Sequence, residues 1–319
     1  MPRPVVSVVI PTHNRSALLR AALDSVHNQT FTDYEVIVVD DGSTEDLRAV
    51  ISGHPARPQL IRSPDQSGPA AARNCGIRAA NGEFIAFLDS DDLWLPTKLE
   101  RFVTALRADP KTKIYYGPMA PITADGRPMA GHTKPCVGGR ITEALFLSSF
   151  VHVPTIVCCR ELLVHHGLFD ESLPVCEDYD LWLRVSLDES FGLIDEPLAL
   201  RRLHPDRLSK SCMRRNLAVK AKVLREFYES IADRNIIAKS VAYERLGHVC
   251  HVAGRAAFYN RRYQEADALL SAARQYGHPG LRSLPLNVAA KAMSRFQPAP
   301  SPAGASGSGT SPSVVKVKA

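Results

Sequence analysis

Three carboxylates lie within four residues in the run Asp89-Ser90-Asp91-Asp92. Carboxylate oxygens are hard ligands that suit Mg²⁺ or Mn²⁺, and an ion held by them is commonly shared with substrate phosphates. Such an ion would neutralise the negative charge that builds on a leaving diphosphate. The structural alternative is a solvated acidic turn that caps the next helix, and the run alone does not decide between the two.

Two further polar clusters follow apolar runs earlier in the chain. Pro11-Thr12-His13-Asn14-Arg15 follows residues 5–10, and Asp40-Asp41 follows residues 34–39. Asn14 is suited to cap the next helix, whose first amides would help to hold a nucleotide. An acidic side chain after the second run would accept hydrogen bonds from a base or ribose. The first cluster lacks the G-x-G-x-x-G pattern, which argues against a nicotinamide enzyme.

A fourth acidic group is Glu177-Asp178-Tyr179-Asp180, which precedes an apolar helical pattern. Acidic residues at a helix start complement the helix dipole, and this needs no functional explanation. The same position would suit a general base that faces a cleft, with Asp178 as the candidate. Spacing alone leaves both interpretations open.

The elements that would position these residues alternate along the first ninety or so residues. Apolar β-branched runs predict buried strands at 5–10, 34–39 and 83–88, with a weaker strand at 58–62, and helical spacing covers 16–28 and 68–80. Ser43 or Thr44 would cap the helix between the second and third strands. This alternation predicts an α/β fold with a mostly parallel sheet and helices on both faces. The three polar clusters would then share the carboxyl edge of the sheet, where ligands bind.

The rest of the chain is less regular until it becomes helical. Residues 97–108 and 178–187 read as helices, and 213–276 reads as helical, with a hairpin of tetratricopeptide type at 243–276. Residues 284–296 are apolar with two basic residues and fit either a packing helix or a surface helix touching a membrane. The Pro, Ser, Gly and Ala composition of 297–319 predicts a disordered tail.

Bulk composition narrows the class of protein. The 319 residues are 45% hydrophobic and carry a formal charge of +6, which fits anionic partners, but no dense basic run favours nucleic acid. Seven cysteines without a C-x-x-C pair argue against a zinc site or a disulfide framework and favour a reducing compartment. We see no signal-peptide pattern and no apolar run long enough to span a membrane. We therefore expect a cytoplasmic protein, with a peripheral position at the inner face of the membrane as an option.

Five segments, in the correct order, resemble the family 2 inverting glycosyltransferases of the GT-A fold over roughly residues 4–210. They are SVVIPTHNR at 7–15, VIVVDDGSTED at 36–46, GPAAARNCGIRAANGEFIAFLDSDDLWLP at 68–96, VCCRELLVHHGLFDESL at 157–173 and EDYDLWLR at 177–184. The resemblance implies a GT-A domain at 1–210, followed by a helical extension at 211–283 and a basic apolar segment with a disordered tail at 284–319.

The resemblance also implies roles for individual residues. The nucleotide would be bound by Pro11, Thr12, Asn14, Asp40, Asp41, Arg73, Asp89 and Ser90, with Asp40 on the base. Asp91 and Asp89 match the metal motif, and Asp178 matches the catalytic base. His204 lies in a stretch that resembles one whose histidine sits near the diphosphate, so it is a candidate metal or phosphate ligand, or simply a packed histidine.

The expected activity is transfer of a sugar from a nucleotide-sugar donor to an acceptor hydroxyl, with Mn²⁺ or Mg²⁺ as cofactor. UDP is the expected nucleotide, and glycan, lipid-linked or protein acceptors in cell-envelope or polysaccharide synthesis are the expected partners. One rival is a nucleotidyltransferase, which would normally carry a Gly- and Arg-rich loop after the first strand. The other rival is a non-catalytic binding module that uses the helical hairpin.

Overall fold

The computed structural model describes residues 3–131, 135–204, 213–277 and 284–294. The chain divides into two compact units after His204. The domain boundary expected at residue 210 and the tail expected at 297–319 both lie outside the described residues.

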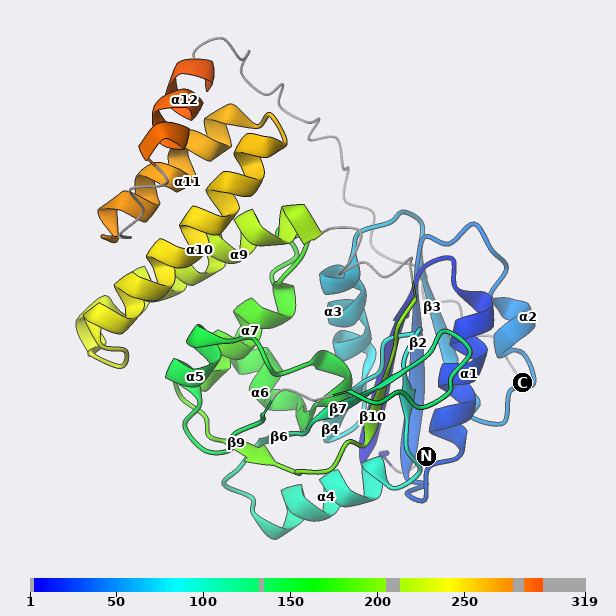
Figure 1. Ribbon diagram of the computed structural model, residues 1–319. Helices are drawn as coiled ribbons and strands as arrows, with labels where there is room; N and C mark the ends of the chain where they lie inside the picture. The colour runs from blue at the N-terminus through cyan, green and yellow to red at the C-terminus, as the bar shows by residue number, and fades with distance from the viewer. Residues whose placement is uncertain (1–2, 132–134, 205–212, 278–283, 295–319) are drawn as a thin grey trace. The chain divides into compact units, whose positions relative to one another are not determined.

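A seven-stranded sheet forms the centre of the first unit (Figure 1). Its strands, from one edge to the other, are β3 (Gln59–Ser63), β2 (Tyr34–Asp41), β1 (Val6–Thr12), β4 (Phe84–Phe87), β8 (Val157–Cys159), β6 (Ile114–Tyr116) and β9 (Phe191–Leu193). Only β8 runs antiparallel to its neighbours, and all the other pairings are parallel. The predicted mostly parallel α/β sheet is therefore confirmed, and β2 extends two residues further than expected, through Asp41.

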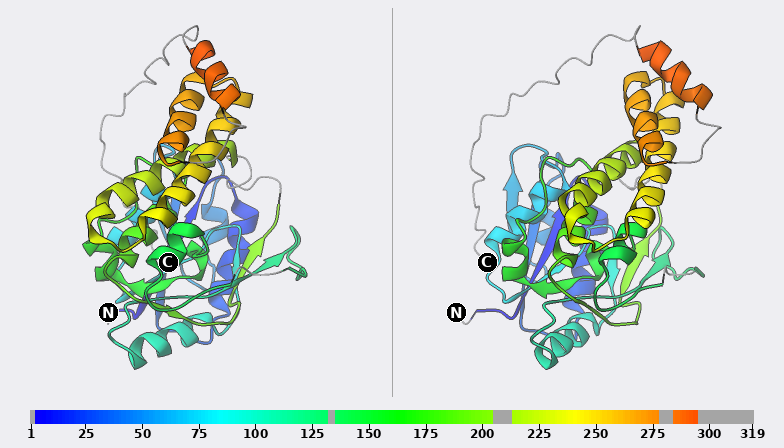
Figure 2. Two further views of the ribbon diagram at one scale, coloured as in Figure 1. Left: turned by 60° about the vertical axis from the view of Figure 1, so that its left-hand side comes forward. Right: turned by 90° about the vertical axis from the view of Figure 1, so that its left-hand side faces the viewer.

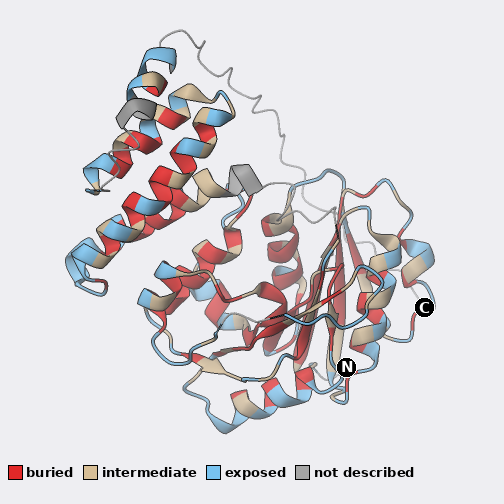
Figure 3. Ribbon diagram, in the orientation of Figure 1, coloured by how far each residue is buried: buried red, intermediate tan, exposed pale blue. Residues whose placement is uncertain are grey.

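Helices cover both faces of this sheet, which explains why the central strands β1, β2 and β4 are mostly apolar and buried. Alternate residues of β1 point to opposite faces, so Val8 and Ile10 pack with α1 (Ser16–His27), α2 (Arg48–Ile51) and α4 (Lys98–Ala108). On the other face, Gly76 of α3 (Pro69–Ala79) lies against Val9. Figure 3 shows the strands buried and the helices exposed on their outer sides.

The helix that carries Asp178 packs on the same face as α3. Phe87 of β4 contacts Phe169, which in turn contacts Trp182 of α7 (Glu177–Ser186) edge to face. Trp182 is fully buried. The start of α7 is thereby fixed against the sheet, close to the end of β4.

Shorter elements complete the first unit. They are α5 (Thr142–Leu147), the 3₁₀ turn η1 (Val153–Thr155), α6 (Arg160–His165), and a second sheet of β5 (Leu93–Trp94), β10 (Ala199–Arg202) and β7 (Met119–Ile122). In this second sheet β10 lies between the other two strands, antiparallel to β5 and parallel to β7. Because β5 directly follows the acidic run, this pairing brings the end of β10 next to it.

Two expected helix caps are wrong. Asn14 does not cap α1, since its backbone is left-handed (φ 50°) and its side-chain oxygen accepts a hydrogen bond from the Thr44 amide at 2.8 Å. Neither Ser43 nor Thr44 caps α2, which begins only at Arg48. The Ser43 hydroxyl instead accepts from the Asn14 amide at 2.9 Å. These side chains tie the loops after β1 and β2 to each other.

The second unit is helical, as expected. It contains α9 (Met213–Ile231), the 3₁₀ turn η2 (Ala232–Arg234), α10 (Lys239–Tyr259), α11 (Tyr263–Gln275) and α12 (Leu284–Ser294). The predicted helical hairpin is formed by α10 and α11, which lie side by side in both views of Figure 2. Their close approach depends on Gly254, where a Cβ would lie 2.7 Å from Leu270. Among the described residues, none of the helices combines the length and apolar character needed to cross a bilayer.

Candidate active site

The acidic run forms a tight turn directly after β4. The Asp92 amide donates to the Asp89 carbonyl at 3.0 Å, and Ser90, Asp91 and Asp92 are buried. Carboxylate oxygens of Asp89, Asp91 and Asp92 all lie within 4.8 Å of one another. Three hard oxygen donors at this spacing fit one Mg²⁺ or Mn²⁺ ion, so the donor set is compatible with the expected cofactor.

Asp91 of this turn contacts two side chains from distant segments. Its Oδ2 atom lies 2.7 Å from Arg15 Nη1 and 3.0 Å from His204 Nε2. His204 is therefore brought to the acidic turn, as its candidate role requires. Arg15 was not singled out from the sequence, although it closes the first polar cluster, because no local spacing links it to a residue 76 positions later.

Arg202 is a second contact that sequence reasoning missed. Its amide donates to Asp92 Oδ1 and its Nε to the Asp91 carbonyl, both at 3.0 Å. Its Nη1 donates to the Ala124 carbonyl at 2.8 Å. Arg202 is buried at the end of β10, so the second sheet holds the backbone of the acidic turn. The sequence offered only an indirect indication of Arg202, because this residue lies two positions before the candidate ligand His204.

Arg73 joins the acidic turn to the start of α7. Its Nη2 lies 2.8 Å from Asp89 Oδ1 and its Nη1 lies 2.6 Å from Glu177 Oε1, while its guanidinium stacks over the Phe169 ring at 5.5 Å. Its side chain is only 7% exposed, and its Nε has no hydrogen-bond partner among the described residues. Arg73 thus lies between two carboxylates rather than on an open surface.

Asp178 lies in the first turn of α7, beside this ion-pair network. Cys176, in a left-handed conformation (φ 64°), precedes the helix, and Asp178 Oδ1 accepts from the Tyr179 amide at 2.8 Å. Burial, with a further contribution from the neighbouring Glu177 charge, raises the pKa of Asp178 to about 7, although Arg73 and the Tyr179 amide act in the opposite direction. A carboxylate with a pKa near 7 is suited to general base catalysis at neutral pH.

The ends of β1 and β2 meet at the same edge of the sheet. Thr12 and Asp40 are register partners, and Pro11 lies opposite Val39. The Thr12 hydroxyl is buried and has no hydrogen-bond partner within the described part of the chain. Buried hydroxyls are normally hydrogen-bonded, so an unpartnered one at this edge of the sheet is suited to bond a ligand.

Asp40 and Asp41 have different environments. Asp40 is fully buried; its Oδ1 accepts from the Ser43 amide at 2.8 Å and its Oδ2 lies 3.4 Å from Arg62 Nε. Asp41 accepts from the Ser67 and Gly68 amides at 2.7 and 2.9 Å, which fixes the turn that leads into α3. Burial raises the pKa of Asp41, although both amide hydrogen bonds oppose this.

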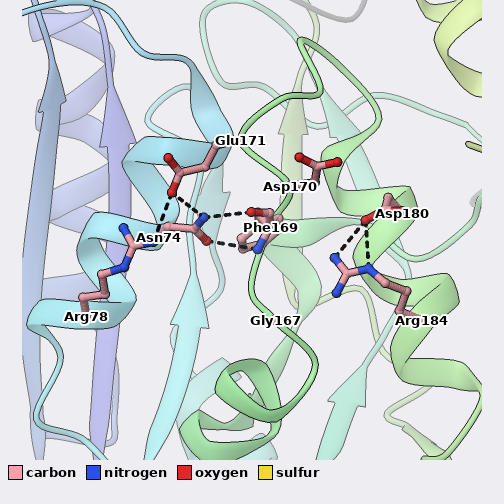
Figure 4. A pocket seen from close by; sticks show the side chains of 8 residues that line it. All are labelled: Asn74, Arg78, Gly167, Phe169, Asp170, Glu171, Asp180 and Arg184. Carbon is pink, nitrogen blue, oxygen red and sulfur yellow. Dashed lines mark hydrogen bonds and ion pairs between the residues drawn. The ribbon is translucent and has the colours of Figure 1, made fainter. Parts of the chain in front are cut away.

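A polar pocket of about 530 Å³ lies between α3, α7 and the loop that precedes α7 (Figure 4). It is lined by Asn74, Arg78, Gly167, Phe169, Asp170, Glu171, Asp180 and Arg184. Glu171 lies 3.1 Å from Arg78 and accepts from Asn74 at 2.8 Å, and Arg184 lies 2.8 Å from Asp180. The Glu171 contacts connect α3 to the loop that precedes α7, and Arg184 of α7 donates to the Leu168 carbonyl of that loop at 2.8 Å. These contacts support the position of Asp178 rather than form part of the acidic turn.

Comparisons with known proteins bear on the same segments. The model of a family described as "Glycosyl transferase family 2" matches residues 7–158. An uncharacterized glycosyltransferase of Haemophilus influenzae is 30% identical over 262 residues, which cover 80% of this chain and 88% of that protein. An Escherichia coli UDP-Glc:alpha-D-GlcNAc-diphosphoundecaprenol beta-1,3-glucosyltransferase is 31% identical over 193 residues, covering 60% of this chain and 73% of that protein.

Two solved structures are similar in fold. TarS of S. aureus in complex with UDP-GlcNAc gives a TM-score of 0.59 at 18% identity, covering 92% of each chain. A mannosyltransferase of Pyrobaculum calidifontis in complex with GDP-Man and Mn²⁺ gives a TM-score of 0.54 at 19% identity, covering 93% of this chain and 82% of that one. At these identities the similarity concerns the fold, and it supports the GT-A-type architecture predicted from the sequence.

Proposed function

Because the chain belongs to glycosyltransferase family 2, we propose that it transfers a sugar from a UDP-linked donor to an acceptor hydroxyl, with inversion at the anomeric carbon. The observation that carries this proposal is the double ion pair of Arg73, to Asp89 at 2.8 Å and to Glu177 at 2.6 Å. It joins the turn suited to the donor diphosphate to the helix that carries the candidate base.

Asp89, Asp91 and His204 would hold Mg²⁺ or Mn²⁺. When bound, the ion supplies positive charge beside the leaving diphosphate. The support is the donor set: carboxylates of the turn lie within 4.8 Å of each other and His204 Nε2 lies 3.0 Å from Asp91. Arg202 fixes the backbone of the same turn and so preorganises these donors.

Asp178 acts as the general base. Its carboxylate takes the proton of the acceptor hydroxyl, and the oxygen attacks the anomeric carbon from the face opposite the diphosphate. The bond between that carbon and the diphosphate oxygen breaks, its electron pair stays on the diphosphate, and the configuration inverts. A pKa raised to about 7 by burial supports this role, because such a carboxylate accepts a proton readily near neutral pH.

The nucleotide would lie along the ends of β1 and β2. Pro11, Thr12 and Asn14 would line its pocket, Asp40 would accept a hydrogen bond from the base, and Asp41 lies alongside. Further contacts would come from Arg73, Asp89 and Ser90. The unpartnered Thr12 hydroxyl and the Asp40 oxygen that faces Arg62 at 3.4 Å support this assignment. A base that binds Asp40 would compete with the half-exposed Arg62 side chain for this oxygen.

The test is a panel of UDP-, GDP- and dTDP-sugars with Mn²⁺, in which nucleoside diphosphate release is measured with and without glycan acceptors. Asp178→Asn should abolish transfer yet retain donor binding, and Asp188→Asn, an exposed carboxylate just past α7, is the matched control. Wild-type turnover in Asp178→Asn would refute the base assignment. Retained anomeric configuration in the product, determined by NMR, would refute inversion.

The same assay separates the rival functions. Release of pyrophosphate instead of nucleoside diphosphate would indicate a nucleotidyltransferase. Binding of sugar nucleotides without turnover, with every acceptor tried, would indicate a binding module.

For the acceptor we propose a lipid-linked or other cell-envelope glycan, with a protein acceptor as the alternative. Support comes from the relative named for a diphosphoundecaprenol acceptor and from α12, where Val288 and Met293 are exposed and Lys291 lies in the last turn. Such a helix would rest on a membrane surface. In co-sedimentation with anionic liposomes, the Val288→Ser/Met293→Ser variant should bind less than wild type. If the wild type, the double variant and a chain truncated at residue 283 all bind liposomes equally, the membrane proposal is wrong.

A further inference from the structure

The Asp91 carboxylate shares one oxygen between two side chains from distant segments. Arg15 Nη1 lies 2.7 Å and His204 Nε2 lies 3.0 Å from Asp91 Oδ2. Asp91 is 10% exposed and Arg15 22% exposed at the side chain. A charged guanidinium therefore lies on the carboxylate that the proposed function assigns to a divalent cation.

Arg15 differs from the other arginines at the acidic turn. Arg73 is enclosed between Asp89 and Glu177, and Arg202 contacts the Asp91 carbonyl rather than its carboxylate. Arg15 is thus the arginine that neutralises the Asp91 carboxylate itself. Without a counter-charge, three carboxylates within 4.8 Å would repel each other strongly at this buried position.

The backbone around Arg15 is fixed by hydrogen bonds, whereas its side chain is partly exposed. The Asn14 amide donates to the Ser43 hydroxyl, the Ser16 amide donates to the Glu45 carboxylate at 2.9 Å, and the Leu19 amide donates to the Arg15 carbonyl at 2.9 Å. The Arg15 side chain is long and partly exposed. Its several side-chain torsions allow the guanidinium to change its distance from Asp91 without a change in the loop.

We propose that Arg15 is a built-in counter-ion for the metal site: it holds Asp91 when no ion is bound, and it gives up Asp91 to a divalent cation and pairs with the donor diphosphate. This inference rests on the proposed function. Two positive groups at one carboxylate repel each other, so a bound cation weakens the pair between Arg15 and Asp91. A nucleoside diphosphate offers the released guanidinium a new partner, because the planar guanidinium matches phosphate geometry. Cation and nucleotide should therefore bind cooperatively, and Arg15 should be the source of part of that coupling.

The experiment measures Mn²⁺ binding to the full chain by electron paramagnetic resonance of the free ion, first with Mn²⁺ alone and then with UDP. Arg15→Gln should bind Mn²⁺ alone about tenfold more tightly than wild type, and UDP should enhance its Mn²⁺ affinity about tenfold less, as expected for a typical coupling between two sites. Arg15→Lys keeps the positive charge, so it should bind Mn²⁺ alone with the affinity of wild type. Arg20→Gln, which removes an exposed arginine on the next helix, should change neither quantity.

Two outcomes would overturn the proposal. The first is a folded Arg15→Gln protein that binds Mn²⁺ alone no more tightly than wild type. The second is an Asp91→Asn variant that binds Mn²⁺ as wild type does, which would also remove the ion from the proposed site. If Arg15→Gln fails to fold, Arg15→Met, which keeps the aliphatic stem, takes its place. Tighter binding of Mn²⁺ alone than in wild type would support charge competition, and unchanged binding would contradict it. Sugar transfer by the wild-type protein is measured separately, so failure of this inference leaves the proposed function standing.

Discussion

Arg73 Nη1 lies 2.6 Å from Glu177 Oε1, and this ion pair joins two segments that are 104 residues apart in the chain. Both side chains are at least nine-tenths buried. Because the same guanidinium also binds Asp89, the Arg73 side chain fixes both the start of α7 and the acidic turn after β4. The distance between the candidate base and the candidate metal site therefore depends on Arg73.

Replacing Arg73 should cost both stability and activity. Arg73→Met leaves Glu177 buried without its counter-charge, and breaking a buried pair in this way typically costs about 3–5 kcal/mol. We expect that loss in the free energy of unfolding from urea titration. Activity should fall as well, because Asp89 and Asp178 lose their common positioning group.

Arg78→Met is the matched control on the same helix. Its partner is Glu171 at 3.1 Å, but both side chains are about half exposed, so removing this pair should cost less than about 1 kcal/mol. Adding Glu177→Gln to Arg73→Met should restore part of the lost stability. Equal losses in Arg73→Met and Arg78→Met would show that the buried pair has no special weight.

The pH dependence of transfer should reflect Asp178. The base works when it is ionised, and burial raises its pKa to about 7 in the free protein. The profile of kcat/KM, which reports the free enzyme, should therefore fall on its acidic side near pH 7 rather than near pH 4. Glu177→Gln should move this limb to lower pH, since the Glu177 charge raises the Asp178 pKa. A limb that stays below pH 5 in the wild-type protein would contradict the assignment.

Asp178→Asn should stabilise the free protein at alkaline pH while it abolishes transfer. A carboxyl whose pKa is raised on folding binds its proton more tightly in the folded state, so its ionisation lowers stability as pH rises from about 4 to about 7. Each unit of pKa shift corresponds to about 1.4 kcal/mol. The gain in Tm from Asp178→Asn should thus be a few degrees at pH 8, smaller at pH 5 and near zero at pH 4. A loss of stability at pH 8 would mean that the Asp178 charge is favourable in the folded protein.

Local sequence patterns predicted the fold and the acidic residues of the site, but not the arginines that contact those acidic residues. The strand that delivers Asp89 and Asp91 was predicted, since apolar runs and their polar ends are adjacent in sequence. Arg15 and Arg202 meet Asp91 only because β1 pairs with β4 and β10 pairs with β5, and no local spacing encodes those pairings. The cap expected at Asn14 failed for a related reason: Thr44, on the neighbouring loop, takes its side-chain oxygen.

Lys98 also escaped sequence reasoning, and it gives a test of the core beneath the site. Its side chain is completely buried; Nζ donates to the Thr155 carbonyl at 3.0 Å and lies 4.0 Å from the centroid of Phe102. Burial holds the pKa of Lys98 well below its usual range, so its protonation lowers the stability of the folded state below the unfolded pKa near 10.5.

Lys98→Met should therefore stabilise the protein at pH 7 relative to its effect at pH 10.5, where the lysine is neutral in the folded state and only about half protonated in the unfolded state. Loss of the hydrogen bond to Thr155 opposes this gain by about 1 kcal/mol at every pH, so the pH dependence of the difference is the informative quantity. Thermal unfolding at both pH values measures it, with exposed Lys111→Met as the control. If Lys98→Met is instead more destabilising at pH 7 than at pH 10.5, the aromatic rings stabilise a charged ammonium there, and burial does not dominate.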